Sequence, residues 1–393
     1  MKRLMSLVLV LVGMLLFSAS RVEAQMGAIR RMGGMTTPSM SARHLKHYSQ
    51  ILGLSETQTK AAGQLLSGYE ADYLAAVSRL TELQQAMQAE FSQTGDFSTM
   101  GELMGDAIKK FRRRTDSIEK SFIDDLKSLL TPDQMSKWPI VERTHRRDST
   151  INWGSLSGES VDVAELVEGL RLDPAQHAAL SQTLEQYAVD LDRELVARNK
   201  IVDEQVAAWL ENIMNPDVQK LQEQMKALRE ASVKIKDINQ RYARLVEGLL
   251  PLEAREPFNQ KVKLASYPQV YRTPYVLRAF DAAEKLDGVD APTLEAIKNL
   301  RDQYTREVGP ANDAWAGAIS ENELKEEDGL QAMARQFGRQ LPEDVQKAKE
   351  ARDAVDAKAL DSLKALLTPE QVKKLPDLKS RPEFDFDANL PAR

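Results

Sequence analysis

The sequence is constrained most strongly by a short string that occurs twice. Residues 128–134 read Ser-Leu-Leu-Thr-Pro-Asp-Gln, and residues 365–371 read Ala-Leu-Leu-Thr-Pro-Glu-Gln. A threonine followed three residues later by glutamine is typical of a capping box, in which each side chain bonds the other residue's backbone N–H. The intervening proline occupies the first helical position, where its missing N–H has no cost. Each string therefore predicts the end of one helix and the start of the next.

Related strings open three successive segments of the chain. They read Leu-Ser-Glu-Thr-Gln, Leu-Asp-Pro-Ala-Gln and Val-Asp-Ala-Pro-Thr, and they begin at Leu54, Leu172 and Val289. Closing leucines follow these openings after 76, 78 and 78 residues, at Leu130, Leu250 and Leu367. Such constant spacing indicates three tandem copies of one module.

Apolar residues recur at three- and four-residue steps between the strings. In the first module they run from Leu66 to Met87 and again from Ile108 to Leu126, which is the spacing of two helices that pack along a seam. We expect the chain to reverse direction near Gly95, Pro216 and Gly329. The fold class predicted is all-α, with three tandem antiparallel long helical hairpins.

The third hairpin is expected to be kinked. Gly309-Pro310 interrupts its outbound helix and Leu341-Pro342 its return helix, and sharp helix kinks are commonly found at proline. One large apolar residue follows each closing leucine by eight positions. We expect these residues to plug the open ends of the hairpins: Trp138, Phe258 and Leu375.

The N-terminus has the composition of a secretory signal peptide. Lys2 and Arg3 precede an apolar run too short to span a bilayer comfortably, and Val22-Glu23-Ala24 suits a cleavage site. The sequence contains no cysteine, which excludes disulfides, thiolate metal sites and thiol catalysis. We predict a periplasmic protein without stable membrane insertion after cleavage.

These features predict the following organisation. The chain begins with a signal peptide (1–24) and a flexible methionine-rich tail (25–42). The first hairpin (43–147) is joined by a polar linker (148–160) to the second hairpin (161–268). The third hairpin (269–378) and a flexible C-terminal tail (379–393) follow.

The strings and the hairpin spacing together resemble the Spy/CpxP family of periplasmic proteins, which carries the Leu-Thr-x-x-Gln motif. Residues 130–134 and 367–371 match the motif fully, residues 54–58 have serine for threonine, and residues 172–176 have aspartate. Residues 250–254 have lost both the cap and the glutamine. The resemblance implies an ATP-independent chaperone that holds unfolded envelope proteins, or a damper of envelope stress; some relatives bind zinc, nickel or copper. Relatives typically have one unit and form dimers. Because this chain has three units, which could supply the partner surface within one chain, a homodimer is one of two possibilities.

Metal binding has weak candidates. His44 and His47 lie three residues apart, downstream of four methionines that include Met35 and Met40. Thioether and imidazole groups suit copper, but two histidines and a flexible tail define no coordination geometry, and the alternative is a solvated helix start. His145 and His177 are isolated in the sequence and are interpreted as incidental.

Charged clusters offer two further candidates. Arg112-Arg113-Arg114 and Arg143 with Arg146-Arg147 could attract acidic clients or lipid headgroups, although a solvated helix face explains the first cluster equally well. Acidic residues gather near the third reversal, where a solvated turn is expected: Glu321, Glu323, Glu326, Glu327 and Asp328.

No catalytic constellation or cofactor motif is recognised, so neither an enzyme nor a cofactor is predicted. The net charge of −6 gives no reason to expect nucleic-acid binding. The leading functional hypothesis is a periplasmic chaperone-like protein whose partners are unfolded or partly folded envelope proteins. The alternatives are an envelope scaffold that binds one folded partner, and a copper- or zinc-responsive protein.

Overall fold

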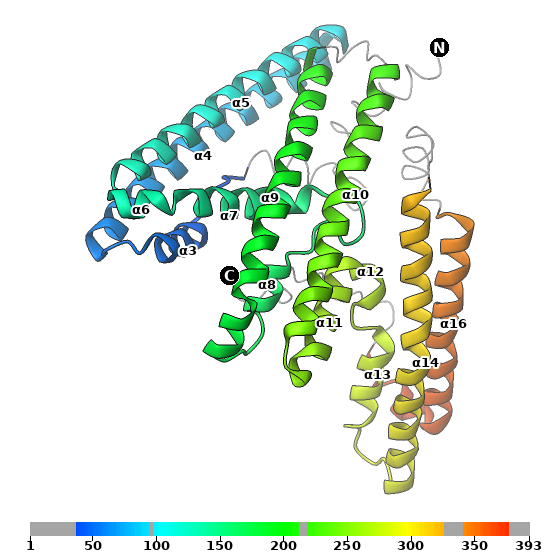
Figure 1. Cartoon of the computed structure of the whole chain (residues 1–393). Coiled ribbons are helices and arrows are strands. Elements are labelled where there is room, and N and C mark those ends of the chain that lie inside the picture. Colours follow the sequence, from blue (N-terminus) through cyan, green and yellow to red (C-terminus); the bar gives the residue numbers. More distant parts are fainter. Residues whose placement is uncertain (1–36, 95–96, 212–217, 326–340, 377–393) are drawn as a thin grey trace. The chain divides into compact units, whose positions relative to one another are not determined.

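The structure is a computed structural model that describes residues 37–94, 97–211, 218–325 and 341–376 (Figure 1). Every regular element within these ranges is a helix, which confirms the all-α class. None of these helices combines the length and the apolar content needed to cross a bilayer. The expected reversals at Gly95, Pro216 and Gly329 lie outside the described residues, as do the expected signal peptide and C-terminal tail.

The chain divides into two compact units. The first contains residues 1–153 and 195–224, and the second contains residues 154–194 and 225–393. The division falls within two long helices, α9 (Pro174–Glu211) and α10 (Val218–Leu249).

The first unit begins with α3 (Ala42–Leu52). Ser41 caps the start of this helix, and Gly53 ends it in the left-handed region at φ 64°, a conformation that glycine adopts without steric cost. The helices that follow are α4 (Glu56–Thr94), α5 (Phe97–Ser128), α6 (Pro132–Ser136), α7 (Trp138–Thr150) and the short 3₁₀ helix η1 (Ile151–Trp153).

The core of the first unit lies between α4 and α5, which run side by side (Figure 1). The ring of Tyr69 lies 5.1 Å from that of Phe122, and the ring of Tyr73 lies 6.3 Å from that of Phe111. Trp138 belongs to the same core, as expected of a plug. Leu83, in contrast, was expected on the seam but is 46% exposed.

The second unit contains α8 (Val163–Glu168), parts of α9 and α10, and a run of further helices. These are α11 (Leu252–Ser266), α12 (Pro268–Tyr271), α13 (Tyr275–Ala283), α14 (Ala291–Leu324), α16 (Glu343–Leu366) and α17 (Pro369–Val372). Helices α14 and α16 pack side by side (Figure 1). Phe258 is fully buried, and Leu375 packs against the core around Phe280.

Gly309-Pro310 was expected to kink or break the outbound helix; it does not break it, because α14 continues through Pro310 as one helix. A proline inside a helix removes one backbone hydrogen bond and crowds the preceding turn. Buried residues on both sides anchor α14, since Tyr304 lies in one apolar core and Trp315 in another. The return helix α16 begins directly after Pro342, which is its N-cap residue.

Two segments expected to be irregular contain packed residues. Residues 148–150 complete α7, and the side chain of Glu159, within the expected linker, is fully buried. Met40, within the expected flexible tail, is 3% exposed and belongs to the core of the first unit.

Candidate functional site

The repeated strings form the capping boxes that the sequence predicts. Thr131 and Gln134 bond each other's backbone N–H groups, and Thr368 and Gln371 do the same. The opening strings use a serine or an aspartate for the cap, and the pairs are Ser55 with Gln58 and Asp173 with Gln176.

In the first unit the two glutamines of the first module also bond each other. Gln58 Nε2 donates to Gln134 Oε1 at 2.8 Å, and Gln134 Nε2 donates to Gln58 Oε1 at 3.1 Å. Each amide nitrogen also donates to the loop beside its partner, Gln58 to the carbonyl of Leu129 and Gln134 to that of Gly53. We call this pair the glutamine clasp. It joins residues 76 positions apart, so it closes the base of the α4–α5 pair.

The other two modules cannot form this clasp. The second has Ala254 at the position equivalent to Gln134, and Arg255 instead donates to the carbonyls of Leu250 and Gly248. The third has Thr293 at the position equivalent to Gln58, and there Asp290 accepts from the backbone of Thr293.

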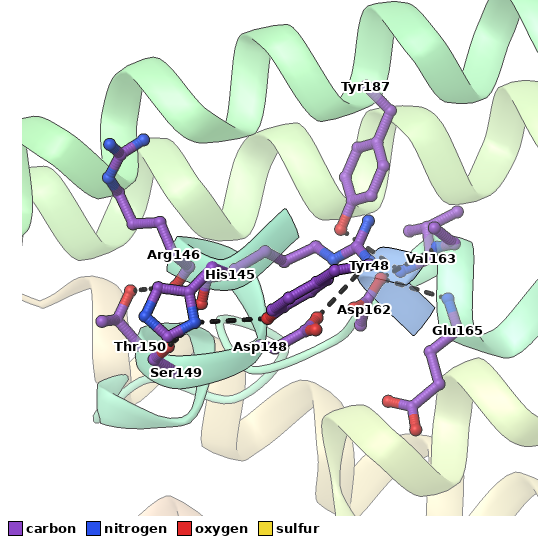
Figure 2. A network of polar contacts seen from close by, with 12 residues as sticks. Tyr48, His145, Arg146, Asp148, Ser149, Thr150, Asp162, Val163, Glu165 and Tyr187 are labelled. Carbon is purple, nitrogen blue, oxygen red and sulfur yellow. Dashed lines mark hydrogen bonds and ion pairs between the residues drawn. The ribbon is translucent and has the colours of Figure 1, made fainter. Parts of the chain in front are cut away.

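A polar cluster lies inside the first unit. Nε2 of His145, on α7, lies 3.3 Å from Oε1 of Glu119, on α5. The other ring nitrogen of His145 lies 3.2 Å from the hydroxyl of Tyr48, on α3, and Figure 2 shows these two groups facing each other. Three helices therefore meet at one histidine.

A non-helical segment, residues 37–40, adds to this cluster; we call it the strap. Ser39 Oγ donates to Glu119 Oε2 at 2.9 Å and lies 3.2 Å from the hydroxyl of Tyr69. The hydroxyl of Tyr73 donates to the carbonyl of Thr37 at 3.1 Å. The strap is therefore bonded to both α4 and α5, while Met40 is buried in the core of the first unit.

Burial and hydrogen bonding shift the pKa values of several groups in and beside this cluster. Burial acts to raise the pKa of Glu119, but hydrogen bonds from His145 and Ser39 outweigh it, so the pKa lies below its ordinary value of 4.5. Burial raises the pKa of Tyr73 to about 12 and also raises that of Tyr69. Burial lowers the pKa of His44, against the opposing charge of Asp148. The carboxylate of Glu119 is thus ionised and fully engaged at neutral pH.

A second polar cluster lies in the second unit and holds the C-terminal end of α14 on α10. Lys236, which is 3% exposed, donates to Glu323 Oε2 at 3.0 Å and to Ser320 Oγ at 3.1 Å. Glu323 Oε1 accepts from both the backbone and the hydroxyl of Ser157. Glu323 was expected in a solvated acidic turn, and that expectation is wrong. Glu326, Glu327 and Asp328 lie outside the described residues.

The same unit fixes the loop that precedes α8. Asn239 donates to the carbonyls of Gly158 and Glu159, and it accepts from the hydroxyl of Tyr187 at 3.0 Å. Tyr187 in turn accepts from the backbone of Val163, as Figure 2 shows. The carboxylate of Glu159 accepts from two backbone N–H groups of its own loop, so this buried charge is compensated.

The proposed metal candidates do not come together as one site. Met35 lies outside the described residues, Met40 is buried among apolar side chains, and His44 and His47 both lie beside the ring of Tyr48. Within the described residues, no group of three or more histidine or acidic side chains is arranged to hold a metal ion.

The basic clusters differ in their surroundings. Arg112 forms an ion pair with Asp203 at 2.8 Å, while Arg113 and Arg114 are exposed. Arg143, Arg146 and Arg147 are partly buried on α7, and Arg147, whose side chain is 11% exposed, lies 3.5 Å from Asp148. The first cluster therefore contributes at least one guanidinium to packing within the first unit.

Large apolar side chains are exposed where α10 ends and α11 begins. Leu245 and Leu249 are each 50% exposed, and Leu252 is 78% exposed. Leu245 and Leu249 are four residues apart and so lie on one helix face. We call these three residues the leucine patch; it belongs to the module whose closing string lacks the cap and the glutamine.

Comparison with known proteins gives no match to any family model, and it finds neither a similar curated protein nor a similar solved structure. The interpretation of this chain therefore depends on its own residues.

Sequence reasoning missed the residues that form the polar cluster of the first unit. His145 was interpreted as incidental, and Glu119 was not singled out. No local signal marks either residue, because their partners lie far away in the sequence.

Proposed function

We propose that the protein holds unfolded or partly folded envelope proteins in the periplasm without using nucleotide and without catalysing a reaction. The observation that carries this proposal is the leucine patch, where Leu245, Leu249 and Leu252 remain exposed beside well-packed helices. Exposed apolar side chains gathered in one place are typical of surfaces that bind other proteins.

We further propose that the chain is a three-module relative of the Spy/CpxP family, secreted through a cleaved signal peptide. Support comes from the capping strings, which have the family's residue pattern, and from the α4–α5 and α14–α16 pairs that follow or precede them. In this three-module organisation, the outbound helix of the third hairpin is α14, which is continuous through Pro310.

The test measures suppression of aggregation. A chemically denatured reference enzyme is diluted into buffer that contains an equimolar amount of the full-length mature protein, and light scattering is followed. We expect the wild type to slow aggregation, and we expect the variant Leu245→Ser, Leu249→Ser, Leu252→Ser to lose at least half of that effect. In the wild type, burial of the three leucine side chains against a client should contribute about 25 cal/mol per Å² of apolar surface buried.

A matched control carries the same change at scattered exposed positions, Leu74→Ser, Val196→Ser and Leu324→Ser. This control should retain the wild-type effect. A wild-type protein that does not slow aggregation would contradict the proposed function, and equal losses in both triple variants would contradict the role of the patch.

A scaffold that binds one folded partner is the second candidate. The buried Lys236–Glu323 pair favours it, because the fixed junction between α10 and α14 would present a rigid surface. An affinity purification that returns a single stoichiometric partner, and no broad set of clients, would support the scaffold over the holding function.

A further inference from the structure

Side chains of α4 and α5 hold the strap by hydrogen bonds. Residues 37–40 belong to no helix, and α4 and α5 supply side-chain groups to both their backbone and their side chains. Tyr73 donates to the carbonyl of Thr37, and Glu119 accepts from the hydroxyl of Ser39. A bond to a backbone carbonyl gives affinity for any sequence, whereas the carboxylate selects a residue that carries a hydroxyl group.

The residue after the serine provides the apolar contact. Met40 is 3% exposed and packs within the core that contains Tyr69 and Phe122. Methionine is unbranched and flexible, so it fills an irregular gap between aromatic rings well. A charged residue at this position would have to be buried without a partner, which is strongly unfavourable.

Tyr69, Tyr73 and Glu119, which hold the strap, also make contacts with residues outside the strap. The ring of Tyr69 packs on Phe122 at 5.1 Å and that of Tyr73 on Phe111 at 6.3 Å. Glu119 is oriented by His145, which in turn contacts Tyr48. The groups that hold the strap are therefore also held by contacts among α3, α4, α5 and α7.

We propose that the face carrying Tyr69, Tyr73 and Glu119 is a binding site for a non-helical segment of a partner protein, with the strap as its resident ligand. The preferred segment has a hydroxyl residue followed by an unbranched apolar residue, as in Ser39-Met40. The strap competes for this site within the same molecule. The apparent affinity for a partner is therefore the intrinsic affinity multiplied by the fraction of molecules in which the strap is released. This site belongs to the first unit and the leucine patch to the second, so the two proposals can fail separately.

The test uses the full-length mature protein and a fluorescein-labelled peptide, Thr-Pro-Ser-Met-Ser, with the sequence of residues 37–41. Met40→Asp should release the strap, so we expect this variant to bind the peptide at least about tenfold more tightly than the wild type. Met135→Asp, at an exposed position, is the matched control and should bind like the wild type. Fluorescence anisotropy measures the affinities, and circular dichroism checks folding.

Two further measurements make the result decisive. A peptide with aspartate in place of methionine should not bind to Met40→Asp, and adding Glu119→Gln to that variant should weaken binding of the original peptide severalfold. If Met40→Asp does not fold, Ser39→Ala replaces it, because it removes a bond of the strap and leaves the site intact; tighter peptide binding than in the wild type is then expected. Equal binding by released and wild-type proteins, or equal binding of both peptides, would overturn the proposal.

Discussion

The bases of the α4–α5 pair and the α14–α16 pair start from the same local motif and are closed in different ways. Both carry a threonine–proline capping box with its glutamine. In the first, Gln134 also bonds Gln58 across the base. In the third module the opposite position is Thr293, so the amide pair cannot form. There the hydroxyl of Tyr275 donates to the carbonyl of Pro376, and Leu375 packs against the apolar core.

This comparison of the two helix pairs distinguishes two roles of the glutamine in the closing string. As a cap, the residue satisfies a backbone N–H group within its own turn. As a member of the clasp, it also joins two turns that are far apart in the sequence. The second role requires a second glutamine, and one substitution in the opposite string is enough to remove it.

The largest expected effect comes from removing the closing glutamine of each pair. Gln134→Ala should destabilise the first pair by about 2–3 kcal/mol, because it removes the glutamine half of the capping box and the amide bonds to Gln58 and Gly53. Gln371→Ala removes only the glutamine half of its capping box and should cost about 1 kcal/mol. Hydrogen exchange, followed by mass spectrometry on peptides from the starts of α4 and α17, measures both effects.

Gln85→Ala, on an exposed position of α4, serves as the control and should change stability by less than about 0.5 kcal/mol. Equal costs for Gln134→Ala and Gln371→Ala would show that the clasp adds nothing to the cap.

An intermediate effect is expected from acid, and it should distinguish the two pairs. The folded-state pKa of Glu119 lies below 4.5, so its stabilisation is present above that pH and is lost as the pH falls through the folded-state value. Glu119→Gln should therefore lower the melting temperature at pH 7, by an amount equivalent to about 1–2 kcal/mol, and the difference should shrink at pH 3.5.

Glu307 on α14 provides the comparison for this experiment. Hydrogen bonds from Gln303 and Lys358 also lower its pKa, but the group lies at the surface, where ion pairs contribute little. Glu307→Gln should leave the melting temperature unchanged at both pH values. A pH-independent effect of Glu119→Gln would mean that packing, and not the ionised carboxylate, is what the substitution disturbs.

The smallest expected effect is a gain. Thr293→Gln places a glutamine at the third position of α14, where Asp290 already provides the cap. A new amide pair with Gln371 should stabilise the third pair by about 0.5–1 kcal/mol. A double-mutant cycle with Gln371→Ala isolates this bond, and a gain that persists in the Gln371→Ala background would exclude the clasp as its origin.

Local features of the fold could be predicted well from the sequence. The capping boxes, the buried seam from Leu66 to Leu80 and the plugging residue Trp138 all appear in the structure. Leu83 departs from the seam, and Pro310 does not break its helix. In both cases the outcome depends on which neighbours are near in space, which the helical period alone does not give.

The sequence by itself determined where helices begin and which faces are apolar, because caps and periodicity depend on residues within about four positions of each other. Tertiary structure decided the rest. It paired Gln58 with Gln134, placed His145 between Glu119 and Tyr48, and buried Met40 in the core of the first unit. These contacts join residues far apart in the chain, and their geometry exists only once the helices have packed.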